Sequence, residues 1–125
     1  MSKKAVSTTK APAAVGPYSQ GMDTGSLIFT AGQLPIHPET GEISSDIAEQ
    51  TRQCMENIKA ILEAAGSSMN KIVKATIFID DFANFATVNE VYGSYFTENH
   101  PARSTVGNVT LARGARVEVE AIALK

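Results

Sequence analysis

The sequence predicts an α+β domain in which two amphipathic helices pack on one face of a β-sheet. Three observations support this prediction. Residues 71–80 alternate apolar and polar side chains, which is the period of a strand, while residues 46–65 and 82–96 place apolar side chains at helical intervals. A chain of 125 residues can bury one hydrophobic core. We therefore expect a single domain over residues 1–125.

Two strands and two helices are predicted in the first hundred residues. The stretch SLIFTAGQLP predicts a buried strand over 27–31, ended by Gly32, and KIVKATIFID predicts a second strand. The first helix begins at Asp46, where Glu49 completes a capping-box pattern, and ends at Gly66. The second helix is expected from Ala83 to Phe96.

Residues 104–124 predict two strand-like segments around ARGA, residues 112–115. In the final segment Glu118 and Glu120 are two residues apart, so they point to the same side of the strand and make that side acidic. Helices that cover one face of a largely apolar sheet leave its other face to be covered. In so short a chain, we expect a second subunit to cover it.

Composition excludes several classes of protein. The chain has 11 Lys and Arg against 13 Asp and Glu without a polybasic block, which disfavours a nucleic-acid-binding protein. The lone Cys54 lies within the helical pattern and is interpreted as an inert core thiol. His37 and His100 lack the spacing of metal ligands, so we expect no metal. Neither a secretory signal nor a membrane span is recognisable, and we expect a cytoplasmic protein.

The residues left for chemistry are few. They are Arg103, the glutamates Glu118 and Glu120, and the three further candidates Tyr18, Gly32 and Asn89. A guanidinium on a half-buried strand either pairs with an internal carboxylate or binds one on a ligand. The first alternative pairs Arg103 across a hairpin with Glu118 or Glu120, and the sequence pattern alone leaves both alternatives open.

Four segments, read in order, resemble the RidA/YjgF family of reactive intermediate deaminases, also called L-PSP proteins. They are APAAVGPYSQG, FTAGQLPIHPETGE, FATVNEVYGSYF, and PARSTV followed by VEVEAIA. The most specific feature is the arginine of the PAR segment with a glutamate fifteen residues later, here Arg103 and Glu118. The resemblance implies a chorismate-mutase-like fold with a mixed sheet. It also implies a homotrimer with clefts between subunits.

The resemblance also implies an activity and a site. Family members hydrolyse 2-iminobutanoate and 2-iminopropanoate, which pyridoxal-phosphate enzymes release, to 2-keto acids and ammonia. Arg103 and Glu118 would be the catalytic pair, and the substrate-binding residues would be Tyr18, Gly32, Asn89, Arg103 and Thr105. No cofactor is implied. A protonated imine is electrophilic enough that water attack needs only positioning and proton transfer.

Two departures from the family pattern and two alternative functions accompany this hypothesis. Many members carry serine and cysteine where this chain has Ala31 and Thr105. The first alternative function is a small-carboxylate-binding or sensing protein without significant turnover, which needs Arg103 but not Glu118. The second is an endoribonuclease, disfavoured by the balanced charge.

Overall fold

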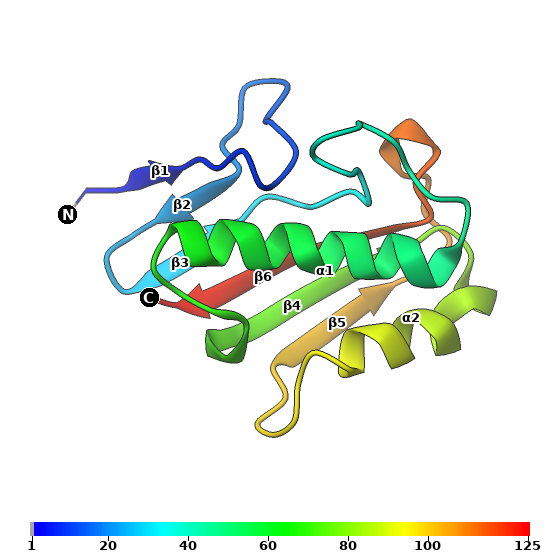
Figure 1. The fold of residues 1–125 in the computed structure, drawn as a ribbon. Helices are drawn as coiled ribbons and strands as arrows, with labels where there is room; N and C mark the ends of the chain where they lie inside the picture. Colours follow the sequence, from blue (N-terminus) through cyan, green and yellow to red (C-terminus); the bar gives the residue numbers. More distant parts are fainter. Residues whose placement is uncertain (1) are drawn as a thin grey trace.

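The computed structural model describes residues 2–125, whose strands form one sheet (Figure 1). The strand order is β1-β2-β3-β6-β4-β5. The bounds are β1 Lys4–Val6, β2 Gly21–Asp23, β3 Leu27–Thr30, β4 Ile72–Ile79, β5 Ala102–Val106 and β6 Val117–Leu124. The β4 and β5 strands run parallel, and the other neighbouring strands run antiparallel. The sheet is therefore mixed, which confirms the predicted fold class.

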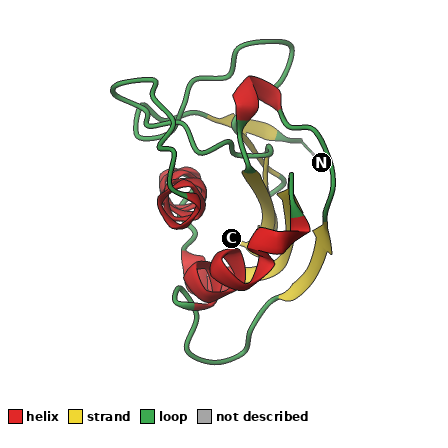
Figure 2. Cartoon of the chain, turned by 90° about the vertical axis from the view of Figure 1, so that its right-hand side faces the viewer, coloured by secondary structure: helices red, strands yellow, loops and turns green. Residues whose placement is uncertain are grey.

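Both helices, α1 (Ile47–Ala64) and α2 (Phe85–Gly93), lie on the same side of a curved sheet (Figure 2). The core between helices and sheet contains Met55 and Ile58 from α1, Val88 from α2, and Ile77 and Val119 from the sheet, each at most 1% exposed. The alternation predicted for residues 71–80 holds from Ala75 onwards, where every second residue of β4 is buried in this core. It fails at the start of the strand, because a register shift between Ile72 and Lys74 leaves Ile72 buried and Val73 41% exposed. Among residues 2–125, neither helix is long and apolar enough to cross a membrane.

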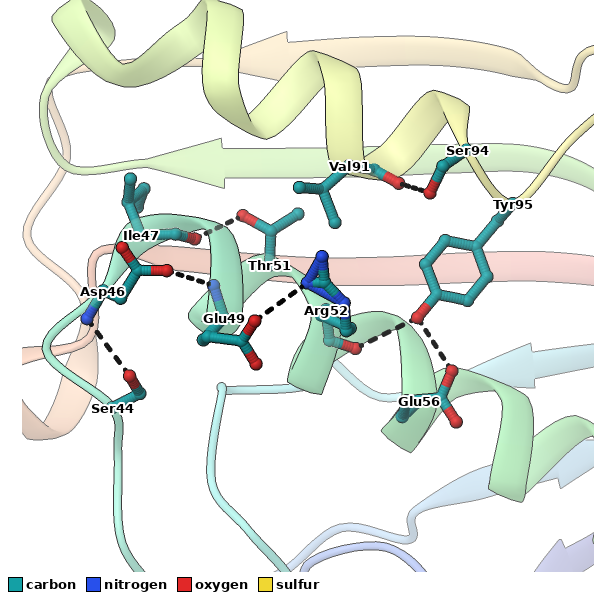
Figure 3. Close-up of polar contacts among 10 residues, drawn as sticks. All are labelled: Ser44, Asp46, Ile47, Glu49, Thr51, Arg52, Glu56, Val91, Ser94 and Tyr95. Carbon is teal, nitrogen blue, oxygen red and sulfur yellow. Dashed lines mark hydrogen bonds and ion pairs between the residues drawn. The ribbon is translucent and has the colours of Figure 1, made fainter.

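The N-terminus of α1 forms as the sequence predicts. The carboxylate of Asp46 accepts a hydrogen bond from the Glu49 amide at 3.0 Å and so caps the helix (Figure 3). The Glu49 side chain, however, accepts a hydrogen bond from Arg52 at 3.1 Å, so only half of the predicted capping box forms. At the other end Gly66 has φ +85°, a left-handed conformation that ends helices.

The second helix is shorter than predicted. A 3₁₀ turn, Phe82–Asn84, precedes it, and α2 covers Phe85–Gly93 instead of residues 83–96. The difference at the N-terminal end arises because the Asp81 carboxylate accepts from the Ala83 amide and tightens the first turn. After Gly93 the chain continues in tight turns, and the Tyr95 hydroxyl donates to Glu56 of α1 at 2.7 Å (Figure 3).

The two C-terminal strands do not form a hairpin. The β4 strand lies between β5 and β6, so the hairpin across which Arg103 would pair with Glu118 does not form. The reason is the connection through α2, because parallel β4 and β5 require a crossover and a helix provides it. The short strands β1 and β2 were not predicted, since three residues are too few for an alternation to be read.

The open face of the sheet carries the glutamates of β6 together with apolar side chains. Glu118 and Glu120 lie in register with Phe78 and Thr76 of β4. Towards the other end of the sheet, Phe29 is 39% exposed and Leu124 is 49% exposed. This face therefore combines an acidic region with an exposed apolar one.

Candidate functional site

Arg103 lies on β5 with its guanidinium on the helix side of the sheet. Its Nη1 donates to the Asn89 side-chain oxygen at 2.7 Å. The guanidinium carbon also lies 5.6 Å from the centre of the Phe85 ring and 5.1 Å from that of Tyr92, so two rings of α2 flank the cation. Phe85, Asn89 and Tyr92 lie at positions i, i+4 and i+7 and therefore share one side of α2.

Arg103 makes no ion pair with any residue that the structure describes. Asn89 accepts from one of the five guanidinium N–H groups, which leaves a donor pair for an incoming carboxylate. Thr105 follows two residues later, on the same side of β5, and is partly buried in register with Ile77. The alternative that pairs Arg103 with Glu118 or Glu120 is therefore wrong for the isolated chain.

Glu118 lies on the opposite side of the sheet from Arg103. Its neighbours Val117 and Val119 point into the core beneath the helices, at 0% and 1% exposure, so Glu118 points to the open face. Burial of the carboxyl, reinforced by the negative charge of Glu120, raises the pKa of Glu118 above its ordinary value. A carboxylate of raised pKa is a stronger base near neutral pH than an ordinary glutamate.

Gly32 is in contact with this carboxylate. A Cβ atom added to Gly32 would overlap the Glu118 Oε2 and lie 3.1 Å from its carboxyl carbon. The next residue, Gln33, exchanges two backbone hydrogen bonds with Val119, at 2.7 and 3.1 Å, which hold this segment against β6. A glycine at position 32 therefore leaves room for the carboxylate beside exposed backbone.

Tyr18 lies near Gly32 on the N-terminal loop and is 51% exposed. Both residues line a cavity of about 290 Å³. Gln20 holds the loop in place, because its side-chain amide donates to the carbonyls of Thr8, Ala11 and Pro12 at 3.0, 3.2 and 2.7 Å. Gln20 was not among the predicted residues, and its burial, at 4% exposed, could not be read from one sequence.

The predicted residues thus form two groups within one chain. Arg103, Asn89 and Thr105 lie on the helix side of β5 and on α2, while Glu118, Gly32 and Tyr18 lie at or near the open side of β6. Sequence reasoning named these six residues but missed the rings of Phe85 and Tyr92 around the guanidinium. The helical spacing of these two residues from Asn89 could have indicated that they share its side of the helix.

The remaining reactive residues lie outside both groups, except Arg113, which lines the cavity of Tyr18 and Gly32. Cys54 is fully buried, with its thiol 3.6 Å from the Val117 carbonyl, and burial raises its pKa, which fits an inert thiol. Among residues 2–125, no cluster of three or more His, Cys, Asp or Glu side chains could hold a metal ion. The guanidiniums of Arg113 and Arg116 contact the Gly41 carbonyl and the Asp80 carboxylate, respectively.

Comparisons with known proteins cover nearly the whole chain. The family model described as Endoribonuclease L-PSP matches residues 8–125. A 2-iminobutanoate/2-iminopropanoate deaminase of Escherichia coli strain K12 is 49% identical over 98% of both chains. A RutC family protein of Pyrococcus abyssi is 52% identical over 100% of this chain and 99% of its own.

Solved structures agree with these relatives. The crystal structure of E. coli TdcF with bound serine has a TM-score of 0.95 at 47% identity and covers 98% of both chains. RidA from an Antarctic Psychrobacter bacterium has a TM-score of 0.94 at 43% identity, over 98% of this chain and 99% of its own. With a family model that matches residues 8–125 and a relative 49% identical along almost its full length, the chain belongs to the L-PSP family, which includes the RidA deaminases.

Proposed function

We propose that this protein is a 2-iminobutanoate/2-iminopropanoate deaminase, which hydrolyses reactive 2-imino acids to 2-keto acids and ammonia. The E. coli relative that bears this name is 49% identical over 98% of both chains. One structural observation supports the substrate class most strongly. Arg103 is fixed by Asn89 and two aromatic rings and makes no ion pair among the described residues, as expected of a carboxylate anchor.

Arg103 would bind the carboxylate that every 2-imino acid carries next to its electrophilic carbon. Two parallel N–H donors of a guanidinium match the two oxygens of a carboxylate, which fixes the orientation of the substrate as well as its position. Because Asn89 and the rings of Phe85 and Tyr92 already restrain the side chain, little rotamer freedom remains to be lost when substrate binds.

Glu118 would hold and deprotonate the attacking water. The water oxygen forms a bond to the imine carbon, the carbon–nitrogen bond breaks, and nitrogen leaves as ammonia after it receives a proton. The raised pKa of Glu118 suits a base that takes a proton and returns it. Gly32 supports this role because its missing side chain leaves backbone close to the carboxylate. Tyr18 would close the cleft, and Thr105 would contribute backbone groups.

The site is proposed to form between subunits of a homotrimer. Arg103 and Glu118 lie on opposite sides of one sheet, so one chain does not present both to the same small substrate. Exposed Phe29 and Leu124 on the open face provide apolar area for a subunit contact. A neighbouring copy that covers this face would bring its own Arg103 group towards Glu118.

One relative provides support from its bound ligand. E. coli TdcF was crystallised with bound serine, which is a small amino acid with a carboxylate next to its nitrogen-bearing carbon. A 2-imino acid has the same arrangement of carboxylate, carbon and nitrogen. Binding of such a molecule by a chain 47% identical to this one fits an arginine anchor for small carboxylates.

The test combines activity with subunit exchange. An amino-acid oxidase or a threonine dehydratase generates the imine, and keto-acid formation is followed with wild-type protein, Arg103→Ala and Glu118→Gln. We expect each variant to lose about 10²-fold or more in rate. After the two variants are unfolded together and refolded, about one quarter of the clefts in a random cyclic trimer combine an intact Arg103 with an intact Glu118.

The outcomes separate the parts of the proposal. Recovery of about a quarter of the wild-type rate supports a cleft that two subunits share. Mixtures that stay inactive while refolded wild type recovers would refute the shared cleft. If wild type does not accelerate hydrolysis of any imine, the deaminase proposal fails. A protein that still binds small carboxylates in that case would instead be a carboxylate-binding or sensing protein.

The name of the matching family model keeps ribonuclease activity as a second candidate. The three arginines of the C-terminal half contact three different protein groups, namely Asn89, the Gly41 carbonyl and Asp80. RNA binding through phosphates weakens steeply as salt is raised. A salt dependence near zero for any RNA bound would count against a role in reading phosphates.

A further inference from the structure

Arg113 occupies a left-handed backbone conformation that is disfavoured for most residues with a side chain. It lies in the 3₁₀ turn Ala112–Gly114 with φ 60° and ψ 22°, and Gly114 follows it with φ +69°. Residues other than glycine, asparagine and aspartate rarely adopt this left-handed region. Its Nη2 donates to the Gly41 carbonyl at 3.2 Å, so the turn is joined to a separate loop. The guanidinium therefore has a defined place in spite of its exposure.

Arg113 is also one of the residues that line the cavity containing Gly32 and Tyr18. Much of the lining is apolar and includes Pro12, Val15, Leu34 and Ile36. Arg113 is the single charged residue among those that line this cavity. A volume of about 290 Å³ is near the lower end of the range for small-molecule sites. The cavity thus combines a short apolar wall with one cation.

We infer that Arg113 selects substrates, and that the cavity accepts 2-imino acids whose side chain ends in a second carboxylate. This inference rests on the proposed function, in which Glu118 and Gly32 lie at the reacting carbon. With the first carboxylate on Arg103, a substrate side chain that extends past Gly32 enters this cavity. The one or two methylenes of a dicarboxylic imine contact the apolar wall, and the terminal carboxylate reaches Arg113.

The reaction itself is the same for these substrates. Water adds to the imine carbon, the carbon–nitrogen bond breaks, and a 2-keto dicarboxylic acid and ammonia result, with no oxidant or reductant required. A neutral alkyl imine fits the same wall but leaves the guanidinium bound only to Gly41 and water. Specificity therefore depends on the terminal charge and not on the shape of the side chain.

The test compares substrates that differ in this charge. Amino-acid oxidases generate imines from aspartate, asparagine and 2-aminobutanoate, and semicarbazide competes for each imine to form an absorbing product whose yield falls as the enzyme acts. The first two imines differ only by carboxylate against amide. The variants are Arg113→Asn, which fits the left-handed backbone without the charge, and Arg113→Lys, which keeps the charge. Arg116→Asn removes the same charge from a residue that contacts Asp80 instead.

We expect wild type to prefer the aspartate-derived imine over the asparagine-derived one in kcat/KM. Arg113→Asn should lower that ratio about five-fold, the upper end for an exposed ion pair. Arg113→Lys should retain part of the preference, and Arg116→Asn should leave the ratio unchanged. An unchanged ratio in Arg113→Asn, or an equal loss for all three imines, overturns the inference. Activity on the 2-aminobutanoate-derived imine tests the proposed function separately.

Discussion

Replacement of Gly32 by alanine tests whether the Glu118 carboxylate must stay where it lies. A Cβ at position 32 would be 3.5 Å from the Glu118 Cγ, which is an ordinary van der Waals contact. It would be 3.1 Å from the Glu118 carboxyl carbon, which is closer than ordinary contact. Ordinary contact requires the carboxyl carbon to retreat by about 0.3 Å and Oε2 by more. The end of the side chain therefore has to rotate, while its stem and the backbone stay in place.

The expected cost is small for folding and large for catalysis. Gly32 does not have a positive φ, so alanine fits its backbone. Alanine also reduces the conformational freedom of the unfolded chain, which offsets part of the destabilisation caused by the close contact with Glu118. The free energy of unfolding should therefore stay within about 1 kcal/mol of wild type. If Glu118 is the base, as proposed, its displacement moves the carboxylate away from the attacking water, and misplacement by about 1 Å costs on the order of 10²-fold in rate. That loss corresponds to about 2.7 kcal/mol of transition-state stabilisation.

The assay is imine hydrolysis together with thermal unfolding. Gly93→Ala is the matched control, because a Cβ there meets no atom within 4 Å. If both changes act through one carboxylate, Gly32→Ala combined with Glu118→Gln should be no slower than Glu118→Gln alone. Full activity of folded Gly32→Ala would refute the reasoning, and so would a double variant whose losses multiply.

Two further predictions concern Glu118 and Tyr92. Within one chain, burial and the charge of Glu120 raise the pKa of Glu118, so ionisation of this carboxyl lowers the free energy of unfolding as the pH rises through that pKa. Glu118→Gln should therefore raise the melting temperature near neutral pH and lose this advantage in acid, where wild type is protonated. The wild-type rate should also fall as the pH is lowered, with a midpoint above the pKa of an ordinary glutamate. If wild type and Glu118→Gln had equal melting temperatures at both pH values, that result would contradict the raised pKa. Tyr92→Leu removes a ring beside Arg103 and should raise KM about five-fold with little change in kcat, from about 1 kcal/mol of cation–π energy. Tyr92→Phe should match wild type, because the hydroxyl that it deletes is buried and has no hydrogen-bond partner among the described residues. If KM rose equally in Tyr92→Leu and Tyr92→Phe, the effect would belong to the hydroxyl and not to the ring.

The local elements could be predicted from the sequence because local spacing determines them. The apolar residues of α1, its cap at Asp46 and its end at Gly66 lie within twenty residues of one another, and helix geometry converts that spacing into one buried face. The α2 boundaries could not be predicted as well, because Asp81 favours a tighter first turn that periodicity does not register.

The arrangement of β5, β4 and β6 depends on contacts that are distant in sequence. Consecutive strands usually pair, which favours the hairpin that the sequence suggested. The parallel pairing of β5 with β4 replaces it, and this places Arg103 and Glu118 two strands apart. Alternation within β5 or β6 shows which residues share a side, but it does not relate the side of Arg103 to that of Glu118. That relation follows only from the core positions of Ala75 and Val119.

Three features that local rules disfavour lie at the Glu118 carboxylate or in the cavity beside Gly32. Glu118 is half-buried beside Glu120, the adjoining position has no side chain at Gly32, and Arg113 lies in a left-handed turn on the wall of the neighbouring cavity. Each feature lowers stability or leaves it unimproved, yet each suits a role proposed above: a stronger base, room for a ligand against backbone, and a cation for a substrate carboxylate. Because natural sequences depart from local consistency mainly at functional sites, this grouping supports a reaction centre at Glu118 independently of any resemblance.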